Sequence, residues 1–66
     1  MADISDSAHL MAEMARRDPR ITITDIVDQM QAEIALVNWA EGTNFDRAKA
    51  QEALLQHHPH LQSSVP

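Results

Sequence analysis

The stretch that decides the fold is TDIVDQMQAEIALVNWAE, residues 24–41. It contains neither glycine nor proline, and Gly42 follows it where helices commonly stop in the left-handed conformation. Apolar residues recur at alternating spacings of four and three, which is typical of a helix that packs along one side. This seam consists of Ile23, Val27, Met30, Ile34 and Val37. We therefore predict a helix over about 24–41.

A first helix is predicted over 5–17. Ser5 or Ser7 can cap its start, and Pro19 prevents it from continuing past Asp18. Its apolar stripe recurs at helical spacing and consists of Ile4, Ala8, Met11 and Ala15, widened by Leu10 and Met14.

A third helix is predicted over 44–58, where it ends before Pro59. Thr43 and Asp46 have the spacing of a capping box. Phe45, Ala48 and Leu55 share one face, with Leu54 at its edge. The turn at 42–44 is short enough to fold this helix back on the central one as a hairpin.

Residues 20–24, Arg-Ile-Thr-Ile-Thr, allow two interpretations. Their alternation of polar and β-branched residues is the pattern of a short strand, which would need a second copy of the chain to pair with. Thr22 and Asp25 also have the spacing of a capping box, in which case the segment is an extended lead into the central helix.

The fold class is thus all-α, with three short helices in one domain over 1–58 and a flexible tail over 59–66. A chain of 66 residues without cysteine has a small core and no disulfide to support it. We therefore expect an intertwined homodimer in which the seam of the central helix is the dimer interface.

The net charge disfavours several classes of partner. Ten acidic and five basic residues give a net charge of −5, which argues against nucleic acid and anionic lipid. No apolar run reaches the roughly 18 residues that span a bilayer, and the N-terminus is acidic where a signal peptide is basic. We expect a cytoplasmic protein of bacterial or phage type.

No pattern of residues predicts catalysis, a metal or a cofactor. There is no glycine-rich phosphate loop, no paired carboxylates on an apolar wall and no ordered nucleophile and base. His57, His58 and His60 invite a metal interpretation, but Pro59 breaks the backbone between them. We expect them to lie in the polar tail, and we expect no enzyme.

The prediction that remains is protein binding. Trp39 and Leu36 fall on the side of the central helix opposite Met30, where they are either packed core or an exposed anchor. The first helix offers Leu10, Met11 and Met14 beside Arg16 and Arg17. We predict a small regulator, inhibitor or adaptor that binds a larger protein through these residues.

Two DNA-binding alternatives compete with this prediction. The order strand, helix, glycine-containing turn, helix over 20–58 weakly resembles ribbon-helix-helix repressors. The resemblance implies that Arg20, Thr22 and Thr24 read the major groove. Asp25 and Asp28 depart from the family, because they follow the strand where the family places a helix N-terminus against phosphate.

The second alternative is a helix-turn-helix around residues 17–22. It requires a break after about residue 30 and a basic recognition helix. The segment 29–41 has no lysine or arginine.

Overall fold

The computed structural model describes residues 4–64, which are mostly helical and contain no strand. The elements in this part of the chain are α1 (Asp6–Ala15), α2 (Ile23–Val37), α3 (Trp39–Thr43), α4 (Arg47–His57) and the 3-10 helix η1 (Pro59–Ser64). The predicted helical class is confirmed. Residues 1–3 of the predicted domain and residues 65–66 of the predicted tail lie outside the described residues.

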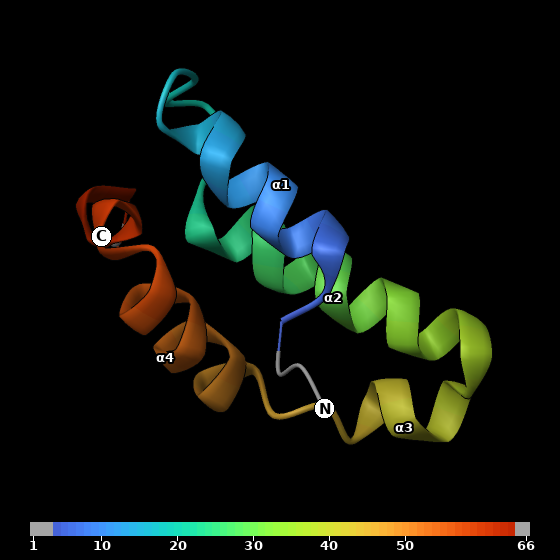
Figure 1. The fold of residues 1–66 in the computed structure, drawn as a ribbon. Helices are drawn as coiled ribbons and strands as arrows, with labels where there is room; N and C mark the ends of the chain where they lie inside the picture. Colours follow the sequence, from blue (N-terminus) through green and yellow to red (C-terminus); the bar gives the residue numbers. More distant parts are fainter. Residues whose placement is uncertain (1–3, 65–66) are drawn as a thin grey trace.

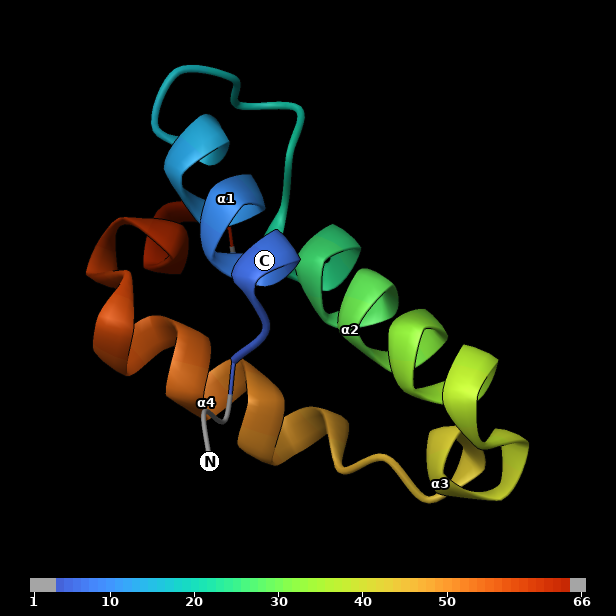
Figure 2. The same cartoon turned by 45° about the vertical axis from the view of Figure 1, so that its right-hand side comes forward.

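The longest helix, α2, is the central element, because α1, α3, α4 and η1 all pack against it. Figure 1 and Figure 2 show α1 and α4 beside its first half, while α3 lies at its far end. The loop from α1 to α2 lies at the opposite end of the molecule from α3. The molecule is elongated, with extents of 33 × 23 × 17 Å.

Helix α1 begins as predicted, with Ser5 as its cap, because the Ser5 hydroxyl accepts a hydrogen bond from the backbone N–H of Ala8 at 3.2 Å. The helix ends at Ala15, two residues earlier than predicted. The loop that follows is folded around Asp18, whose carboxylate accepts hydrogen bonds from the backbone and guanidinium of Arg20 at 3.0 Å each.

Residues 20–24 are the lead into α2 and not a strand. The Thr22 hydroxyl accepts from the Asp25 backbone N–H at 3.2 Å, and the Asp25 carboxylate accepts from the Thr22 N–H at 3.0 Å. This is the predicted capping box, which satisfies two donors at the helix start. The strand interpretation is therefore wrong, and Thr24 is already part of α2.

The helix predicted over 24–41 is two helices, because Asn38 interrupts it. Asn38 has extended backbone angles, φ −151° and ψ 106°, and its side chain accepts from the Ala40 N–H at 3.1 Å. Asparagine side chains compete for backbone donors in this way and favour helix starts over helix interiors. The continuous stretch 23–37 also lacks the break near residue 30 that a helix-turn-helix requires.

Gly42 does not stop a helix in the left-handed conformation, since no described residue has a positive φ. It lies inside α3 and faces α2 at close range. A Cβ at this position would stand 2.5 Å from the Ala35 Cβ and 2.8 Å from the Ala35 Cα. The glycine is therefore required for close approach of α3 to α2.

The start of α4 also differs from the prediction. Its cap is Asp46, which accepts from the Lys49 N–H at 3.1 Å, whereas Thr43 ends α3 and donates to the Ala40 carbonyl at 2.8 Å. Phe45 lies before the helix, yet Phe45 and Leu55 both pack against the core as predicted, whereas Ala48 is exposed. The buried residues of α4 are Ala50 and Leu54.

Polar contacts connect this start of α4 to the middle of α2. Arg47 lies 2.7 Å from the Asp28 carboxylate and donates to the side-chain oxygen of Gln31 at 2.7 Å. The amide nitrogen of Gln31 in turn donates to the Gly42 carbonyl at 2.8 Å. One region of α2 therefore positions both α3 and α4.

The core is formed by small and medium side chains from every element except α3. Its buried hydrophobic residues are Ile4, Ala8, Ala12, Ile23, Ile26, Val27, Met30, Ala50, Leu54 and Leu61. Leu61, only 1% exposed, belongs to the segment that the sequence assigns to a tail. Residues 59–64 are instead part of the packed unit.

Candidate functional site

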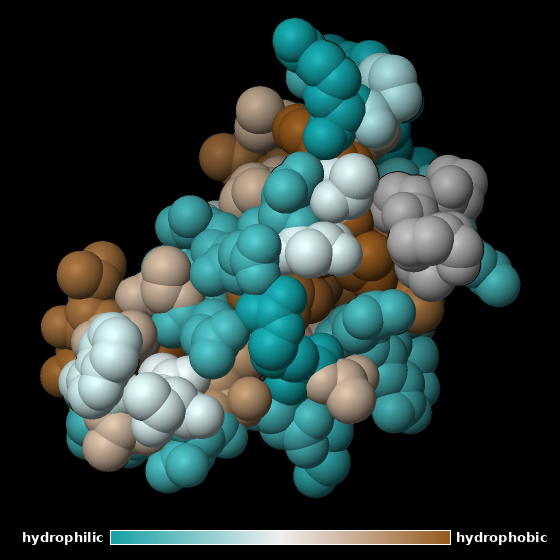
Figure 3. Space-filling view, turned by 180° about the vertical axis from the view of Figure 1, so that it is seen from behind, coloured by the Kyte–Doolittle hydropathy of each residue, from teal (hydrophilic) through white to brown (hydrophobic). Residues whose placement is uncertain are grey.

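The most exposed large hydrophobic side chains lie where α2 meets α3. Leu36 is 88% exposed, Val37 89% and Trp39 75%. The break at Asn38 turns the chain here and leaves α3 too short to cover them. Figure 3 shows hydrophobic atoms gathered at this end of the molecule. We call these three residues the apolar corner.

Val37 is shared between the apolar corner and a neighbouring groove of about 350 Å³. Apolar side chains from α2 and from the segment before α4 form much of its lining, and two glutamates are present with them. The lining consists of Ser5, Met30, Glu33, Ile34, Val37, Glu41 and Phe45. We call this the acidic groove.

A second hollow, of about 270 Å³, lies beside Trp39 on another face of α2. It is lined by Asp28, Gln31, Ala32, Ala35, Trp39, Gly42 and Thr43. Of the two interpretations of Trp39, packed core or exposed side chain, the structure therefore has the exposed one. Its indole borders an open hollow and is not enclosed in the core.

The predicted dimer seam is divided between the core and the surface. Ile23, Val27 and Met30 are 1%, 2% and 4% exposed and pack within the chain. Ile34 is half-buried in the acidic groove, and Val37 is exposed. Only the C-terminal end of the seam is open to another molecule.

The predicted partner face of α1 is partly open. Leu10 is 63% exposed and Met14 49%, whereas Met11 is half-buried against the core. Arg16 is paired with Glu13 at 2.8 Å. Arg17 is exposed, and the structure of residues 4–64 gives it no ion pair.

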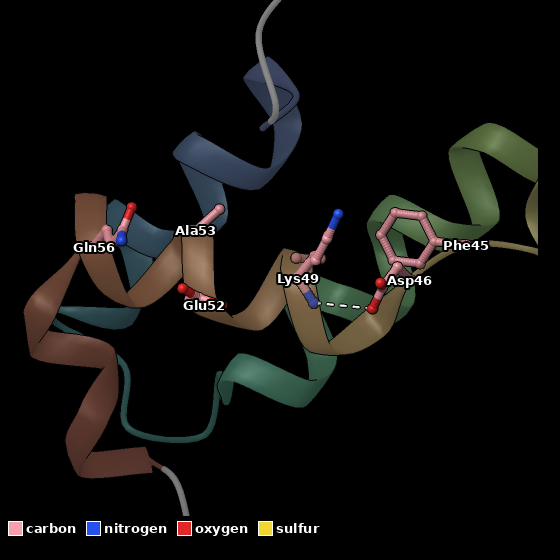
Figure 4. A pocket seen from close by; sticks show the side chains of 7 residues that line it. Phe45, Asp46, Lys49, Glu52, Ala53 and Gln56 are labelled. Atoms are coloured by element: carbon pink, nitrogen blue, oxygen red, sulfur yellow. Dashed lines mark hydrogen bonds between the residues drawn. The ribbon is translucent and has the colours of Figure 1, made fainter.

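A hollow of about 480 Å³ lies along α4 (Figure 4). Asp46 uses its carboxylate there to cap the helix at the Lys49 N–H. Glu52 and Gln56 lie on later turns of the same helix. Among the described residues, no hydrogen bond or ion pair joins Lys49 to Glu52.

A cluster of histidines joins α1 to the C-terminal segment, and the sequence pattern did not reveal it. His58 is 7% exposed, and its Nε2 lies 2.9 Å from His9 Nδ1. His60 donates through Nε2 to the Ala12 carbonyl at 2.6 Å. Each contact spans nearly fifty residues, and no local spacing encodes such a pair. One signal in the sequence was the pair of apolar residues Pro59 and Leu61, which lie on either side of His60.

Burial and the neighbouring charges shift the pKa of His58 in opposite directions. Burial, followed by the charge of His9, lowers the pKa of His58 below its ordinary 6.5. The Glu13 carboxylate, whose Oε1 lies 3.7 Å from His58 Nδ1, opposes that shift, while His60 and Arg16 add to it. Within the described part of the chain, no three His, Asp or Glu side chains gather as a metal site.

None of the described helices combines the length and apolar character needed to cross a bilayer. Comparison of the chain with family models, with curated proteins and with solved structures finds no match in any of the three.

Proposed function

We propose that the protein is a small non-enzymatic regulator or adaptor that forms a homodimer and binds a larger protein through the apolar corner. The observation that carries this proposal is the exposure of Leu36, Val37 and Trp39 together at one end of a small chain. Removing such side chains from water is worth roughly 25 cal/mol per Å² of apolar surface. A contiguous exposed apolar patch is characteristic of an interaction site.

The residues of the corner favour a protein as the ligand. Tryptophan is enriched among the side chains that dominate the affinity of protein interfaces. Trp39 is the first residue of α3, and α3 lies at one end of the elongated molecule (Figure 1), where a pocket in a larger protein could enclose the exposed indole. Binding of this kind places a helical segment in an apolar groove of the partner.

The alternative, a DNA-binding regulator, has less support. Of the three residues that a ribbon-helix-helix protein would use, Thr22 caps α2, Thr24 lies in the helix, and the Arg20 side chain is paired with Asp18. Between Arg20 and Arg47 the sequence has five acidic residues and no lysine or arginine. Such a surface repels the phosphate backbone.

The experiment is affinity capture from cells that express the protein, with Trp39→Ala and Leu36→Ser compared with the unchanged chain. We expect both substitutions to reduce capture of the same protein while leaving the melting temperature unchanged. Lys49→Ala, an exposed position on α4, is the control that should capture normally. Equal capture by all four chains would refute binding through the corner.

Fluorescence supplies an independent measurement, because Trp39 is the only tryptophan. In the free protein we expect red-shifted emission that a soluble quencher reduces. With the captured partner added, the emission should shift to the blue and become protected from the quencher.

A further inference from the structure

The acidic groove has a definite chemical character. Ile34 is half-buried and Val37 is exposed, so apolar surface in the groove remains open to solvent. Glu33 and Glu41 line the same groove. A matching surface must therefore combine apolar side chains with a cation.

Three of the five basic residues lie together at one end of the molecule. Arg16, Arg17 and Arg20 belong to the end of α1 and its loop, and α3 lies at the opposite end of the molecule (Figure 1). Two copies aligned antiparallel would place the basic end of each beside the acidic groove of the other. Aligned in parallel, they would bring like charges together, which disfavours association.

One face of α1 has the features that the groove requires. Leu10 and Met14 are one turn apart on α1, and Arg17 lies in the turn that follows the helix, where its N–H donates to the Met14 carbonyl at 3.0 Å. Arg16 and Arg20 are already paired with Glu13 and Asp18. Arg17 is therefore the cation of this face that is available for an intermolecular contact.

We propose that the acidic groove of one copy receives the α1 face of a second copy, so that Leu10 and Met14 contact Ile34 and Val37 while Arg17 meets Glu33 and Glu41. Figure 3 shows hydrophobic atoms both on the flank of α1 and at the α2–α3 end, along the same edge of the molecule. Both surfaces can then engage at once around a two-fold axis, which makes each contact twice.

This inference rests on the homodimer of the proposed function and specifies the surfaces through which the two copies bind each other. The dimer uses the groove side of α2, whereas Leu36 and Trp39 remain free for the larger protein. Val37 belongs to both surfaces, but Leu36 and Trp39 test partner capture alone, and Arg17 and Glu41 test self-association alone, so failure of one is distinguishable from failure of the other.

Sedimentation equilibrium of the full chain tests the proposal at micromolar concentration and low salt, where we expect a species of twice 7.4 kDa. Arg17→Glu and Glu41→Arg should each raise the dissociation constant at least about tenfold, because each places like charges in contact. Combining Arg17→Glu with Glu41→Arg restores one of the two opposite-charge contacts, while Glu33 then faces a like charge, so the double variant should bind more tightly than either single variant.

The matched control is Lys49→Glu, which makes the same change of charge as Arg17→Glu at an exposed position on α4. It should leave the dissociation constant unchanged. Circular dichroism of each variant confirms that the helices are intact. A monomer at all concentrations, or a double variant no tighter than the single ones, would overturn the proposal. A dissociation constant that neither Arg17→Glu nor Glu41→Arg changes would overturn it in favour of another surface. Partner capture through Trp39 would stand in either case.

Discussion

At the scale of single residues, the side chain with the most constrained chemistry is His58. It is almost fully buried, and its ring shares a hydrogen bond with His9 that requires one nitrogen to donate and the other to accept. Protonation of both rings would remove the acceptor and place two positive charges about 3 Å apart. The packing of the C-terminal segment on α1 therefore depends on a neutral ring in this pair.

We expect the free energy of unfolding to decrease as the pH falls from about 7.5 to 5. The pKa of His58 is lower in the folded protein than its ordinary 6.5, so the unfolded chain binds a proton more readily and acid favours unfolding. The stabilisation is fully present above 6.5 and is lost as the pH falls through that value toward the folded pKa. Urea unfolding at stepped pH measures it, with a slope from this group of at most about 1.4 kcal/mol per pH unit.

The control is the neighbouring histidine, His57, which is exposed. His58→Gln should flatten the slope, whereas His57→Gln should retain it. Hydrogen bonds from Arg16 and Arg20 lower the pKa values of Glu13 and Asp18 below 4.5 and 3.8, so these carboxyls titrate outside this window. An unchanged slope in the His58 variant would contradict the prediction.

The sequence could not place His58 because its environment is built by contacts between distant parts of the chain. Periodicity describes what lies on one face of one helix, and the partners of His58 lie on α1. By contrast, Ser5 and Thr22 were predicted as caps, because a cap and its target are three residues apart.

At the scale of elements, the separation of α2 from α3 produces the apolar corner. The sequence predicted a helix through this region because every residue from 24 to 41 tolerates one. Asn38 interrupts the helix instead, because its side chain accepts a hydrogen bond from the Ala40 N–H. An uninterrupted helix would have carried Trp39 along α2, and α3 could not have folded back against it.

Close packing of α3 on α2 gives a prediction about Gly42. Gly42→Ala should destabilise the fold by about 1–3 kcal/mol, because the added Cβ overlaps both the Cβ and the backbone of Ala35. An exposed helical glycine would behave oppositely, since alanine is the better helix former. Thermal or urea unfolding measures whether Gly42→Ala lowers or raises the free energy of unfolding.

A second substitution, at Ala35, tests whether contact with Ala35 causes the loss of stability in Gly42→Ala. Ala35→Gly removes the side chain 2.5 Å from the new Cβ but leaves the Cα at 2.8 Å, so Gly42→Ala combined with Ala35→Gly should lose less stability than the sum of the two single changes. Strict additivity would show that the two positions are not in contact. A stabilised Gly42→Ala variant would show that α3 does not pack against Ala35.

At the scale of the whole molecule, the core is small, and three of its residues are alanines, Ala8, Ala12 and Ala50. Alanines let the helices approach closely but contribute little apolar area of their own. Larger side chains, such as Ile26, Leu54 and Leu61, must therefore supply much of the stability. Leu61 comes from the segment that the sequence assigned to a tail, because a 3-10 helix of six residues has no apolar periodicity to detect.

Leu61 thus gives a test of whether residues 59–64 belong to the folding unit. Leu61→Ala should destabilise the protein by about 2–5 kcal/mol, because the side chain is 1% exposed and its loss leaves a cavity. A core of this size supplies only about 3–5 kcal/mol, so much of the variant should be unfolded at 25 °C. Leu36→Ala is the matched control, since it removes the same atoms from a side chain that is 88% exposed and should change stability by less than about 0.5 kcal/mol. Circular dichroism during urea unfolding distinguishes the two. Equal midpoints for the unchanged chain and Leu61→Ala would mean that burial of the Leu61 side chain adds nothing to the stability of the fold.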